Sequence, residues 1–566
     1  MSEHDLDAIA LPTLNEAQMA ALGRCPLTTS RRYRDGETLF EAGDRECKFD
    51  VVKSGEVEIR DDSAEPSTTI VVLRPGQFTG DVAHLAASPA LVTCVARGGC
   101  EVFEVSPDAL RELMDRHLDL ADVILRAFIA RWRFLRESGR FTGLRVIGSR
   151  DSPETFRVRT FLAKNGVPLT WLDLEADPRA RPLLRQFRAS EADTPLVAWG
   201  NRLVLRHPSD RELAEALGLR RPLEPGVYDL VVAGAGPAGL AAAVYGASEG
   251  LRTVVLERTA PGGQAGRSMR IENYLGFPIG ITGSELAERA FVQANKFGAH
   301  IPVSTRATRL TFEGGHAVLE LDGGETVTTR CLLIATGADY RRLGVEGCEQ
   351  YEGRGVYYAA TPIEAQMCQG SEVVVVGGGN SAGQAAVFLA TQVRKVYLVI
   401  RGDDLNKDMS AYLARRVEEH PRIEVLRNTE VRGMSGEGHL GEVELVNNKS
   451  GAVRRLRTPA LFSFIGAAPR TDWLPPEVER DAKGFVRTGP ALAQSPHWTA
   501  PRQPFLLEAS RPGVFAAGDV RSGSVKRVAS AVGEGAMAVQ FVHEYLKEVN
   551  HAERHEAGTP ARQQSG

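Results

Sequence analysis

The chain has 566 residues, of which 43% are hydrophobic and 25% are charged, and its formal net charge is −4 at pH 7. This length exceeds what one hydrophobic core supports, so several domains are expected. The nearly balanced charge excludes a strongly basic nucleic-acid-binding protein, and no apolar run is long enough to cross a membrane. With no signal peptide and no paired cysteine motif, a protein of the reducing cytoplasm is expected.

Residues 1–143 are predicted to form a small β-roll followed by helices. Short strands with turn signals between them occupy the region from 28 to 105, and longer helical segments follow. Three sequence patterns, which begin at Gly36, Val52 and Leu73, resemble those of cyclic-nucleotide-binding domains. The resemblance implies a ligand cassette, which here spans residues 80–93.

This cassette lacks the residue that would hold a cyclic phosphate. In the family an arginine pairs with that phosphate, and Ala90 occupies its position, although Asp81 could still accept a ribose hydroxyl. Because a charge-assisted contact is lost, cyclic nucleotide binding is disfavoured, and a regulatory or dimerisation module is expected instead. Four arginines of the last helix are predicted to form a solvated face: Arg131, Arg133, Arg136 and Arg140.

Residues 144–222 carry the pattern of a second small domain. A strand, a helix and another strand are followed by a hairpin and by a closing helix at 210–217. This order resembles a glutaredoxin-like thioredoxin fold, in which Thr194-Pro195 takes the place of the family's cis-proline. The redox cysteines of that family belong where Ser152-Pro153-Glu154-Thr155 stands, and serine and threonine there are ordinary helix caps.

A glycine-rich nucleotide finger begins the next region, at residues 228–239. An apolar strand leads into a turn with Gly234, Gly236 and Gly239, and a helix follows. Glycines let the backbone approach a pyrophosphate, and the helix N-terminus offers unpaired N–H groups to it. The second strand ends at Glu257, where a carboxylate would accept a ribose hydroxyl, so this segment predicts dinucleotide binding.

A second finger follows at residues 373–382 and contains Gly377 and Gly379. It ends in Ala382 rather than glycine, which the motif tolerates. No acid closes its second strand, and Arg401 comes shortly after that strand. Because a cation suits a 2′-phosphate better than a free ribose hydroxyl, NADPH is favoured, with NADH as the alternative.

Further segments between residues 226 and 550 turn the two fingers into a family match. In their order they closely resemble the low-molecular-weight thioredoxin reductases. They lie at 262–264, 271–278, 332–337, 514–519 and 526–537. The resemblance implies a homodimer, and an FAD domain that is interrupted by an inserted NADPH domain.

The resemblance also implies the binding residues. Those for FAD are Gly234, Gly236, Pro237, Ala238, Gly239, Glu257, Gly263, Gln264, Asn273, Ala335, Thr336, Gly337, Gly518, Asp519, Lys526, Arg527 and Val528. Those for the nicotinamide nucleotide are Gly377, Gly379, Asn380, Ser381, Ala382 and Arg401. By this likeness Glu257 holds the adenosine ribose, Gln264 and Asn273 lie beside the flavin and its ribityl chain, and Asp519 bonds a ribityl hydroxyl.

The chain departs from the family at the redox dithiol. Ala359 and Pro362 take the two positions of its Cys-x-x-Cys, and neither side chain can form a thiolate, so no catalytic residue is predicted. Of the seven cysteines, Cys348 and Cys368 flank the lost pair and are the candidates to replace it, or else they are ordinary free cysteines. The family's His-Arg-Arg signature is reduced to Arg401, which weakens the preference for NADPH.

Three functions remain open at this point. The first is an FAD-dependent NAD(P)H oxidoreductase that passes electrons to a carrier protein, a quinone or oxygen instead of an internal dithiol. The second is a thioredoxin-disulfide reductase that uses Cys348 or Cys368, and the third is a nucleotide or redox sensor with little turnover. No metal site is predicted.

The expected fold class is multidomain: a β-roll, a thioredoxin-like α/β domain and two Rossmann-like three-layer domains for FAD and NAD(P). The expected boundaries are 1–143, 144–222, 223–343, 344–465 and 466–550, with a disordered tail at 551–566. The third and fifth of these segments together form the FAD domain.

Overall fold

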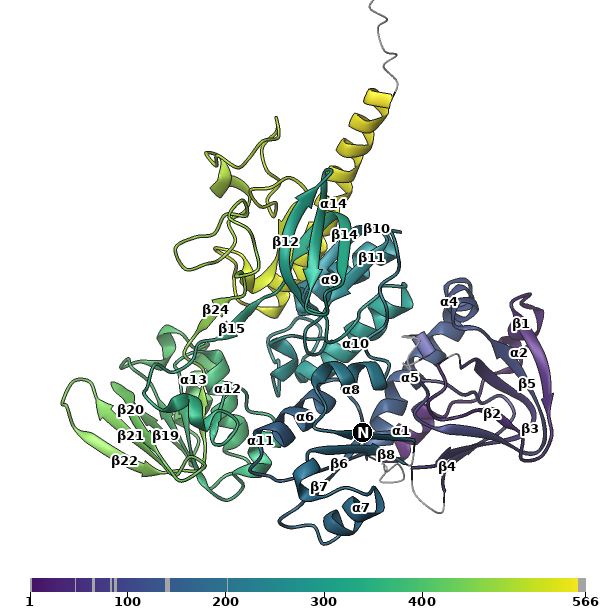
Figure 1. Cartoon of the computed structure of the whole chain (residues 1–566), viewed down its shortest axis with the longest axis horizontal. Helices are drawn as coiled ribbons and strands as arrows, with labels where there is room; N and C mark the ends of the chain where they lie inside the picture. Colours follow the sequence, from purple (N-terminus) through teal and green to yellow (C-terminus); the bar gives the residue numbers. More distant parts are fainter. Residues whose placement is uncertain are drawn as a thin grey trace, which may run out of the picture. The chain divides into compact units, whose positions relative to one another are not determined.

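The computed structural model of the chain describes residues 3–557 except 46, 64–66, 82–83, 86–88, 138–142 and 201. It divides into two compact units (Figure 1). The first comprises Met1–Arg221 with Asn295–Phe297, and the second comprises Pro222–Ala294 with Gly298–Gly566.

The first unit begins with an antiparallel β-roll. Its strands pair in the order β1-β5-β3-β4, and β2 also pairs with β5. An aromatic cluster of Phe49, Phe78 and Phe128 joins the roll to the long helix α5, with ring centroids 5.3–6.1 Å apart. The elements are α1 (Glu3–Ala10), α2 (Glu16–Arg24), β1 (Thr28–Tyr33), β2 (Thr38–Phe40), β3 (Phe49–Asp61), β4 (Thr68–Leu73), β5 (Thr93–Val105), α4 (Pro107–Arg116) and α5 (Leu118–Glu137).

The prediction of a solvated arginine face on α5 is wrong for Arg131. Its side chain is buried, and it donates hydrogen bonds to the main-chain oxygens of Ala10, Phe78 and Gly80. Its guanidinium also lies 4.6 Å from the Phe78 ring centroid. The helix therefore turns this charge toward the roll, where three carbonyls replace water. Arg133, Arg136 and Arg140 fall outside the residues whose side chains are described.

A four-stranded sheet follows in the same unit, with strand order β7-β6-β8-β9. Strands β6 and β7 are parallel, and the other pairs are antiparallel. Ser152 caps α6 by accepting a hydrogen bond from the Thr155 N–H, and the Thr194–Pro195 peptide bond is cis. The elements are β6 (Leu144–Gly148), α6 (Pro153–Lys164), β7 (Leu169–Asp173), α7 (Ala180–Gln186), β8 (Leu196–Trp199), β9 (Leu203–Arg206) and α8 (Asp210–Ala216).

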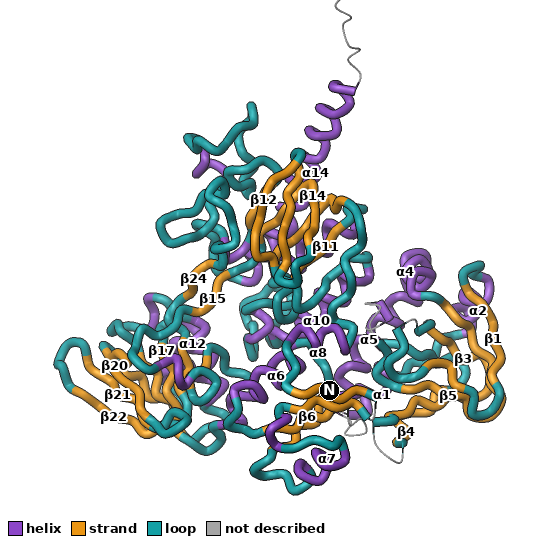
Figure 2. Tube along the Cα trace, viewed as in Figure 1, coloured by secondary structure: helices purple, strands orange, loops and turns teal. Residues whose placement is uncertain are grey.

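The second unit has a six-stranded sheet at its centre. Strands β11, β10, β14 and β25 are parallel to their neighbours, while β12 and β13 extend the sheet in the antiparallel sense. Helices α9 and α14 pack together against this sheet (Figure 1), and Figure 2 shows α14 in purple beside the orange strand β14. The elements are β10 (Val227–Ala233), α9 (Pro237–Ser248), β11 (Thr253–Leu256), α10 (Gly283–Lys296), β12 (Ala307–Glu313), β13 (His316–Leu321), β14 (Thr326–Ile334), β25 (Val514–Ala516) and α14 (Val528–Ala557).

An inserted domain interrupts this part of the chain between β14 and β25. The chain leaves along β15 (Ala338–Tyr340) and returns along β24 (Ala467–Pro469), and these two strands pair antiparallel. The insert has a parallel sheet of order β16-β23-β17-β18-β19 and a three-stranded antiparallel sheet, β20-β21-β22.

The elements of the insert are β16 (Val356–Tyr357), α11 (Pro362–Met367), β17 (Glu372–Val376), α12 (Asn380–Leu389), β18 (Lys395–Val399), α13 (Ala411–Glu418), β19 (Ile423–Leu426), β20 (Thr429–Ser435), β21 (Glu442–Asn447), β22 (Val453–Arg457) and β23 (Leu461–Ser463).

The start of the disordered tail, predicted at residue 551, is placed too early in the chain. Helix α14 continues to Ala557, so residues 551–557 are helical, whereas 558–566 lie outside the described residues. The segment after Asn550 is poor in apolar residues, which is why its sequence indicated disorder. A helix that is already formed can extend into such residues because each added residue gains a backbone hydrogen bond without a new nucleation step.

Candidate functional site

The first glycine finger lies between β10 and α9. Gly234 adopts a φ of +108°, and a Cβ there would lie 2.5 Å from the Ala335 carbonyl oxygen. A Cβ on Gly239 would lie 1.8 Å from the Gly234 oxygen. The nearest atom to a Cβ on Gly236 is the Gly263 Cα at 4.0 Å. Packing therefore demands glycine at the first and third positions, while the space before Gly236 is open, as the approach of a pyrophosphate requires.

Glu257 follows β11 and is hydrogen-bonded to the glycine finger. Its carboxylate is buried and accepts hydrogen bonds from the backbone N–H groups of Ala235, Thr259 and Ala260, at 2.8–3.1 Å. The predicted ribose ligand is thus also a structural clamp that joins the end of the second strand to the glycine turn. Its sequence position predicted the first role but not the second.

Gln264 and Thr336 carry polar groups beside the finger. The Gln264 side chain donates from Nε2 to the Ala338 oxygen at 3.2 Å, but its buried Oε1 has no hydrogen-bond partner among the described residues. Thr336 donates to the Arg470 oxygen at 3.0 Å, and Gly337, with a φ of +66°, faces open space. A buried acceptor without a donor fits a ligand that brings an N–H group, as the ring of a flavin does.

The segment before α14 supplies the other predicted FAD residues. Asp519 is half-buried, and burial raises the pKa of its carboxyl group although Lys526 opposes the shift. Gly518 has a φ of +76°, and its N–H donates to Glu534 at 2.7 Å. Glu534 also binds Arg521, so it fixes the loop that carries Asp519. Glu534 belongs to the segment 526–537 that supports the family resemblance, but its spacing alone did not predict this role because the role depends on the contact with Gly518.

The remaining predicted FAD residues fall into two groups. Ala238 contacts α14 so closely that a Cβ on Gly535 would lie 2.1 Å from the Ala238 oxygen. By contrast, the side chains of Asn273, Lys526 and Arg527 are exposed. Pro237 and Val528 are the first residues of α9 and α14. These three exposed residues belong to the predicted FAD set, but the structure does not place them together in a polar cluster.

The second finger lies between β17 and α12. Gly377 has a φ of +140°, and a Cβ there would lie 2.5 Å from the Phe464 oxygen. Asn380 accepts hydrogen bonds from the N–H and hydroxyl of Ser410 at 2.8 and 3.0 Å, and the Tyr340 hydroxyl bonds Ser381 at 3.1 Å. Gly379 caps α12, and Ala382 is buried within that helix. The Tyr340 contact links this finger to β15, through which the insert is connected.

Arg401 lies just beyond β18, and its side chain is exposed with no partner among the described residues. The neighbouring acid, Asp403, is paired with Lys407 at 2.9 Å and with Lys449 at 3.8 Å. Asp403 is thus engaged with these lysines, and the exposed Arg401 guanidinium can meet an anion at the end of this strand.

The two positions for which the sequence predicts a replaced dithiol, Ala359 and Pro362, lie just before and at the start of α11. Pro362 is the first residue of that helix, and Thr361 caps it in a reciprocal pair with Glu364. Cys348 and Cys368 are each 2% exposed, and burial raises both pKa values, that of Cys368 to about 12. Both groups are therefore neutral thiols that solvent hardly reaches, which argues against either as a nucleophile.

In the first unit, Ala90 stands where the family resemblance would place a phosphate-binding arginine, and its main chain is hydrogen-bonded to the segment after β2. Ala90 is buried, its N–H donates to the Asp44 oxygen at 2.9 Å, and its oxygen accepts from the Gly43 N–H at 2.8 Å. The neighbouring Pro89 packs against the following domain, where a Cβ on Gly218 would lie 2.0 Å from the proline ring. Asp81 is half-buried at the other end of the cassette.

The described residues contain neither a metal-binding cluster nor a membrane-spanning helix. No group of three His, Cys, Asp or Glu side chains is placed to hold a metal ion. No helix in the described ranges has the length and apolar character that crossing a membrane requires.

Comparison with known proteins agrees with the two-finger geometry. Residues 228–535 match the pyridine nucleotide-disulphide oxidoreductase family, and residues 30–117 match the cyclic nucleotide-binding domain. The thioredoxin reductase of Bacillus subtilis (strain 168) is 33% identical over 327 residues, which are 58% of this chain and 97% of the relative. That of Treponema pallidum (strain Nichols) is 35% identical over 323 residues, which are 56% and 97%.

Solved structures show the same relationship. The Lactococcus lactis thioredoxin reductase in the FR conformation superimposes with a TM-score of 0.51 at 28% identity, over 57% of this chain and 99% of that one. The T. acidophilum thioredoxin reductase gives a TM-score of 0.51 at 29% identity with the same coverage. The chain carries an N-terminal cyclic nucleotide-binding domain, belongs to the pyridine nucleotide-disulphide oxidoreductase family, and is an FAD-dependent oxidoreductase similar to thioredoxin reductases.

Proposed function

We propose that the protein takes hydride from NADPH onto FAD and passes the electrons to an acceptor that is not a dithiol of its own chain. This proposal rests on one contrast: the chain keeps both nucleotide fingers, but the described structure has no reactive thiol near α11. Two nucleotide fingers with open phosphate-facing glycines are kept, yet Ala359 and Pro362 replace the cysteines, and the nearest thiols are buried and neutral. The acceptor is a carrier protein, a quinone or oxygen, and a disulfide substrate is disfavoured for want of a thiolate.

The chain's part in this reaction is binding and orientation. Bound FAD would supply hydride acceptance, and that step needs no acid or base from the protein. Gly236 would take the pyrophosphate, Gln264 Oε1 would accept an N–H of the ring, and Asp519 would bond the ribityl chain. Arg470 pairs with Asp339 across the β15–β24 connection. We propose that the insert turns about these two strands to bring the nicotinamide to the flavin.

Three assignments belong to the same proposal. Residues 144–222 form a thioredoxin-like domain, which the strand order β7-β6-β8-β9 with its flanking helices supports. The other boundaries between domains fall at 143, 343 and 465, as the sequence predicts. The protein acts as a homodimer in the cytoplasm.

Mixing the protein with NADPH in the absence of oxygen should bleach the flavin within seconds. Reduced protein mixed with oxygen, a quinone, a ferredoxin or flavodoxin, or thioredoxin should then recover its flavin absorbance fastest with one of the first three classes. Stopped-flow absorbance measures both steps. Recovery that is fastest with oxidised thioredoxin would refute the proposal, as would a flavin that neither NADPH nor NADH bleaches.

Replacing Arg401 with alanine should raise KM for NADPH roughly tenfold and leave KM for NADH unchanged, because a charged contact to the 2′-phosphate is worth about 1.5–3 kcal/mol. Steady-state kinetics with both coenzymes measures this change. Arg394→Ala is the matched control, since Arg394 precedes the same strand, is 71% exposed and pairs with Glu372. Equal effects of Arg401→Ala on the two coenzymes would contradict the assignment.

A further inference from the structure

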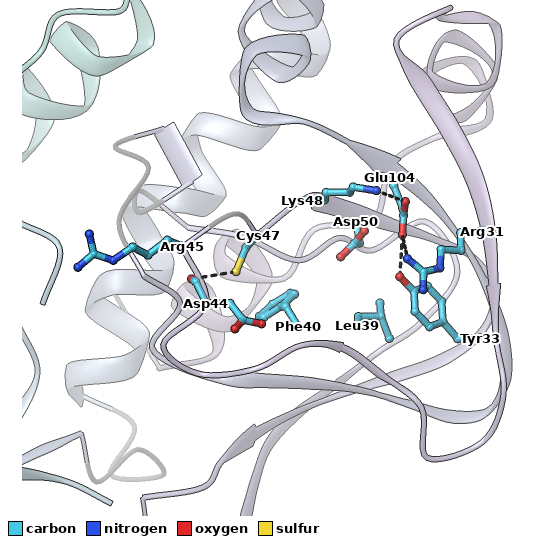
Figure 3. A pocket seen from close by; sticks show the side chains of 10 residues that line it. All are labelled: Arg31, Tyr33, Leu39, Phe40, Asp44, Arg45, Cys47, Lys48, Asp50 and Glu104. Carbon is cyan, nitrogen blue, oxygen red and sulfur yellow. Dashed lines mark hydrogen bonds and ion pairs between the residues drawn. The ribbon is translucent and has the colours of Figure 1, made fainter. Parts of the chain in front are cut away.

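A cavity of about 360 Å³ lies in the β-roll of the first unit (Figure 3). Side chains of β1, β2, β3 and β5 and of the segment between β2 and β3 line it. The cassette residues Gly80, Asp81 and Ala90 are not among its described lining residues. Its volume lies in the range of small-molecule sites. The cavity adjoins the cassette, because the main-chain oxygens of its lining residues Asp44 and Lys48 are hydrogen-bonded to Ala90 and His84.

Asp50 is the distinctive group of this cavity. Its side chain is 3% exposed and points into the cavity, yet its Oδ1 has no hydrogen-bond partner among the described residues (Figure 3). Burial raises the pKa of this carboxyl group well above its ordinary value, and the negative charge of Glu104 adds to the shift. A buried carboxyl oxygen without a hydrogen-bond partner is costly, and a ligand that donates to it would remove this cost.

The neighbouring polar groups contact Glu104. Lys48 donates to Glu104 at 2.5 Å, the Tyr33 hydroxyl donates to it at 2.6 Å, and Arg31 lies 3.6 Å away. Although burial alone would raise the pKa of Glu104, these hydrogen bonds hold it below its ordinary value. Glu104 is thus charged and already occupied by the cations of the wall, while Asp50 is left for a ligand.

We propose that this cavity binds a small molecule that presents a flat pair of N–H donors to Asp50. A carboxylate accepts two parallel N–H bonds from such a group, which is among the strongest neutral-pH contacts available. Phe40 and Leu39 form the apolar part of the wall, against which the rest of the molecule would pack. Two sources carry this chemistry: a guanidinium or amidinium compound, and the Watson–Crick edge of a guanine nucleotide.

Binding here would extend to the next domain through the segment between β2 and β3. Arg45 lines the cavity and donates to the Glu215 oxygen at 3.0 Å, close to the end of α8. From the same segment, Glu41 accepts from Arg202 at 3.0 Å, and Arg202 also donates to the Ala42 oxygen. A ligand in the cavity would therefore lie beside a segment that is already hydrogen-bonded to the next domain of the first unit.

The test uses calorimetric titration of the full-length protein with two matched pairs of probes. Benzamidine is compared with benzamide, and guanosine monophosphate with adenosine monophosphate. The member with paired N–H donors should bind at least tenfold more tightly in one or both pairs. Asp50→Asn should abolish this preference, whereas Asp108→Asn, the same change at a side chain that is 94% exposed, should keep it.

The thermal stability of Asp50→Asn separates lost binding from misfolding. Because folding raises the pKa of Asp50, its ionisation opposes folding above the unfolded-state pKa of about 4. At neutral pH the ligand-free variant should therefore melt at or above the temperature of the original protein. Preference for benzamidine alone would identify a cation site, and preference for the guanine nucleotide alone a nucleotide site.

Equal binding within each pair, no binding of any probe at millimolar concentration, or an Asp50→Asn variant that binds as the original does would each overturn the proposal. The adenine and guanine nucleotides can also enter the fingers of the second unit. For this reason the difference between the original protein and Asp50→Asn, and not binding as such, is the criterion.

Discussion

Replacing both Ala359 and Pro362 with cysteine should give the protein a new NADPH-dependent disulfide reductase activity, if its own electrons go to another acceptor as proposed. Position 362 is the first residue of α11, and a helix N-terminus stabilises a thiolate there. Thr361 and Glu364 already cap this turn, so the new side chains enter a helix start that is formed. Reduction of a small aromatic disulfide, followed by the colour of the released thiol, measures the gain.

The two single cysteine variants are the controls for this experiment. Each supplies one thiol, which cannot form the internal disulfide that the cycle needs, so both should stay at the level of the original protein. A double variant that binds FAD, is reduced by NADPH and still shows no activity above the single variants would contradict the account. It would mean that more than the two sulfur atoms separates this protein from its relatives.

Gly535→Ala should lower both the stability of the protein and its FAD content, whereas Gly533→Ala should preserve or improve both. The two glycines lie on α14 two residues apart. A Cβ at position 535 would lie 2.1 Å from the Ala238 oxygen of the finger helix, while one at 533 has nothing within 4 Å. Overpacking costs about 1–3 kcal/mol, and an exposed helical glycine changed to alanine gains about 0.5–1 kcal/mol.

Melting temperature and the flavin absorbance per protein of the purified variants measure these effects. The expected signs are opposite, with a fall of a few degrees for Gly535→Ala and no fall for Gly533→Ala. Ala238 lies between the finger glycines Gly236 and Gly239. A shift of α14 would therefore also shift the proposed pyrophosphate site. Equal FAD content in the two variants would show that the close helix contact does not support the finger.

The fingers could be predicted from the sequence because their chemistry is local. The turn needs glycine at positions 234 and 239, and an acid follows at Glu257. These residues therefore stand at fixed spacings along the chain. The resemblance to thioredoxin reductases, which the comparisons confirm, rests on such spacings. The absence of a Cys-x-x-Cys could also be seen in the sequence, since a cysteine is either present in the chain or absent from it.

The features that could not be predicted depend on distant contacts. Arg131 resembles any surface arginine of a helix, and its burial follows from carbonyls at Ala10, Phe78 and Gly80, which are 51–121 residues away. Glu534 and Asp50 lie in ordinary stretches of helix and strand, and their roles arise only when the loop before α14 and the wall of the roll are assembled.

The central claim is that electrons leave the flavin without passing through a dithiol, and an anaerobic reductive titration tests it most directly. A flavin without a redox-active disulfide takes up one hydride, so about one equivalent of NADPH should bleach the protein completely. The Cys348→Ser, Cys368→Ser variant should give the same end point. A requirement for about two equivalents in the original protein, falling to one in the variant, would contradict the account.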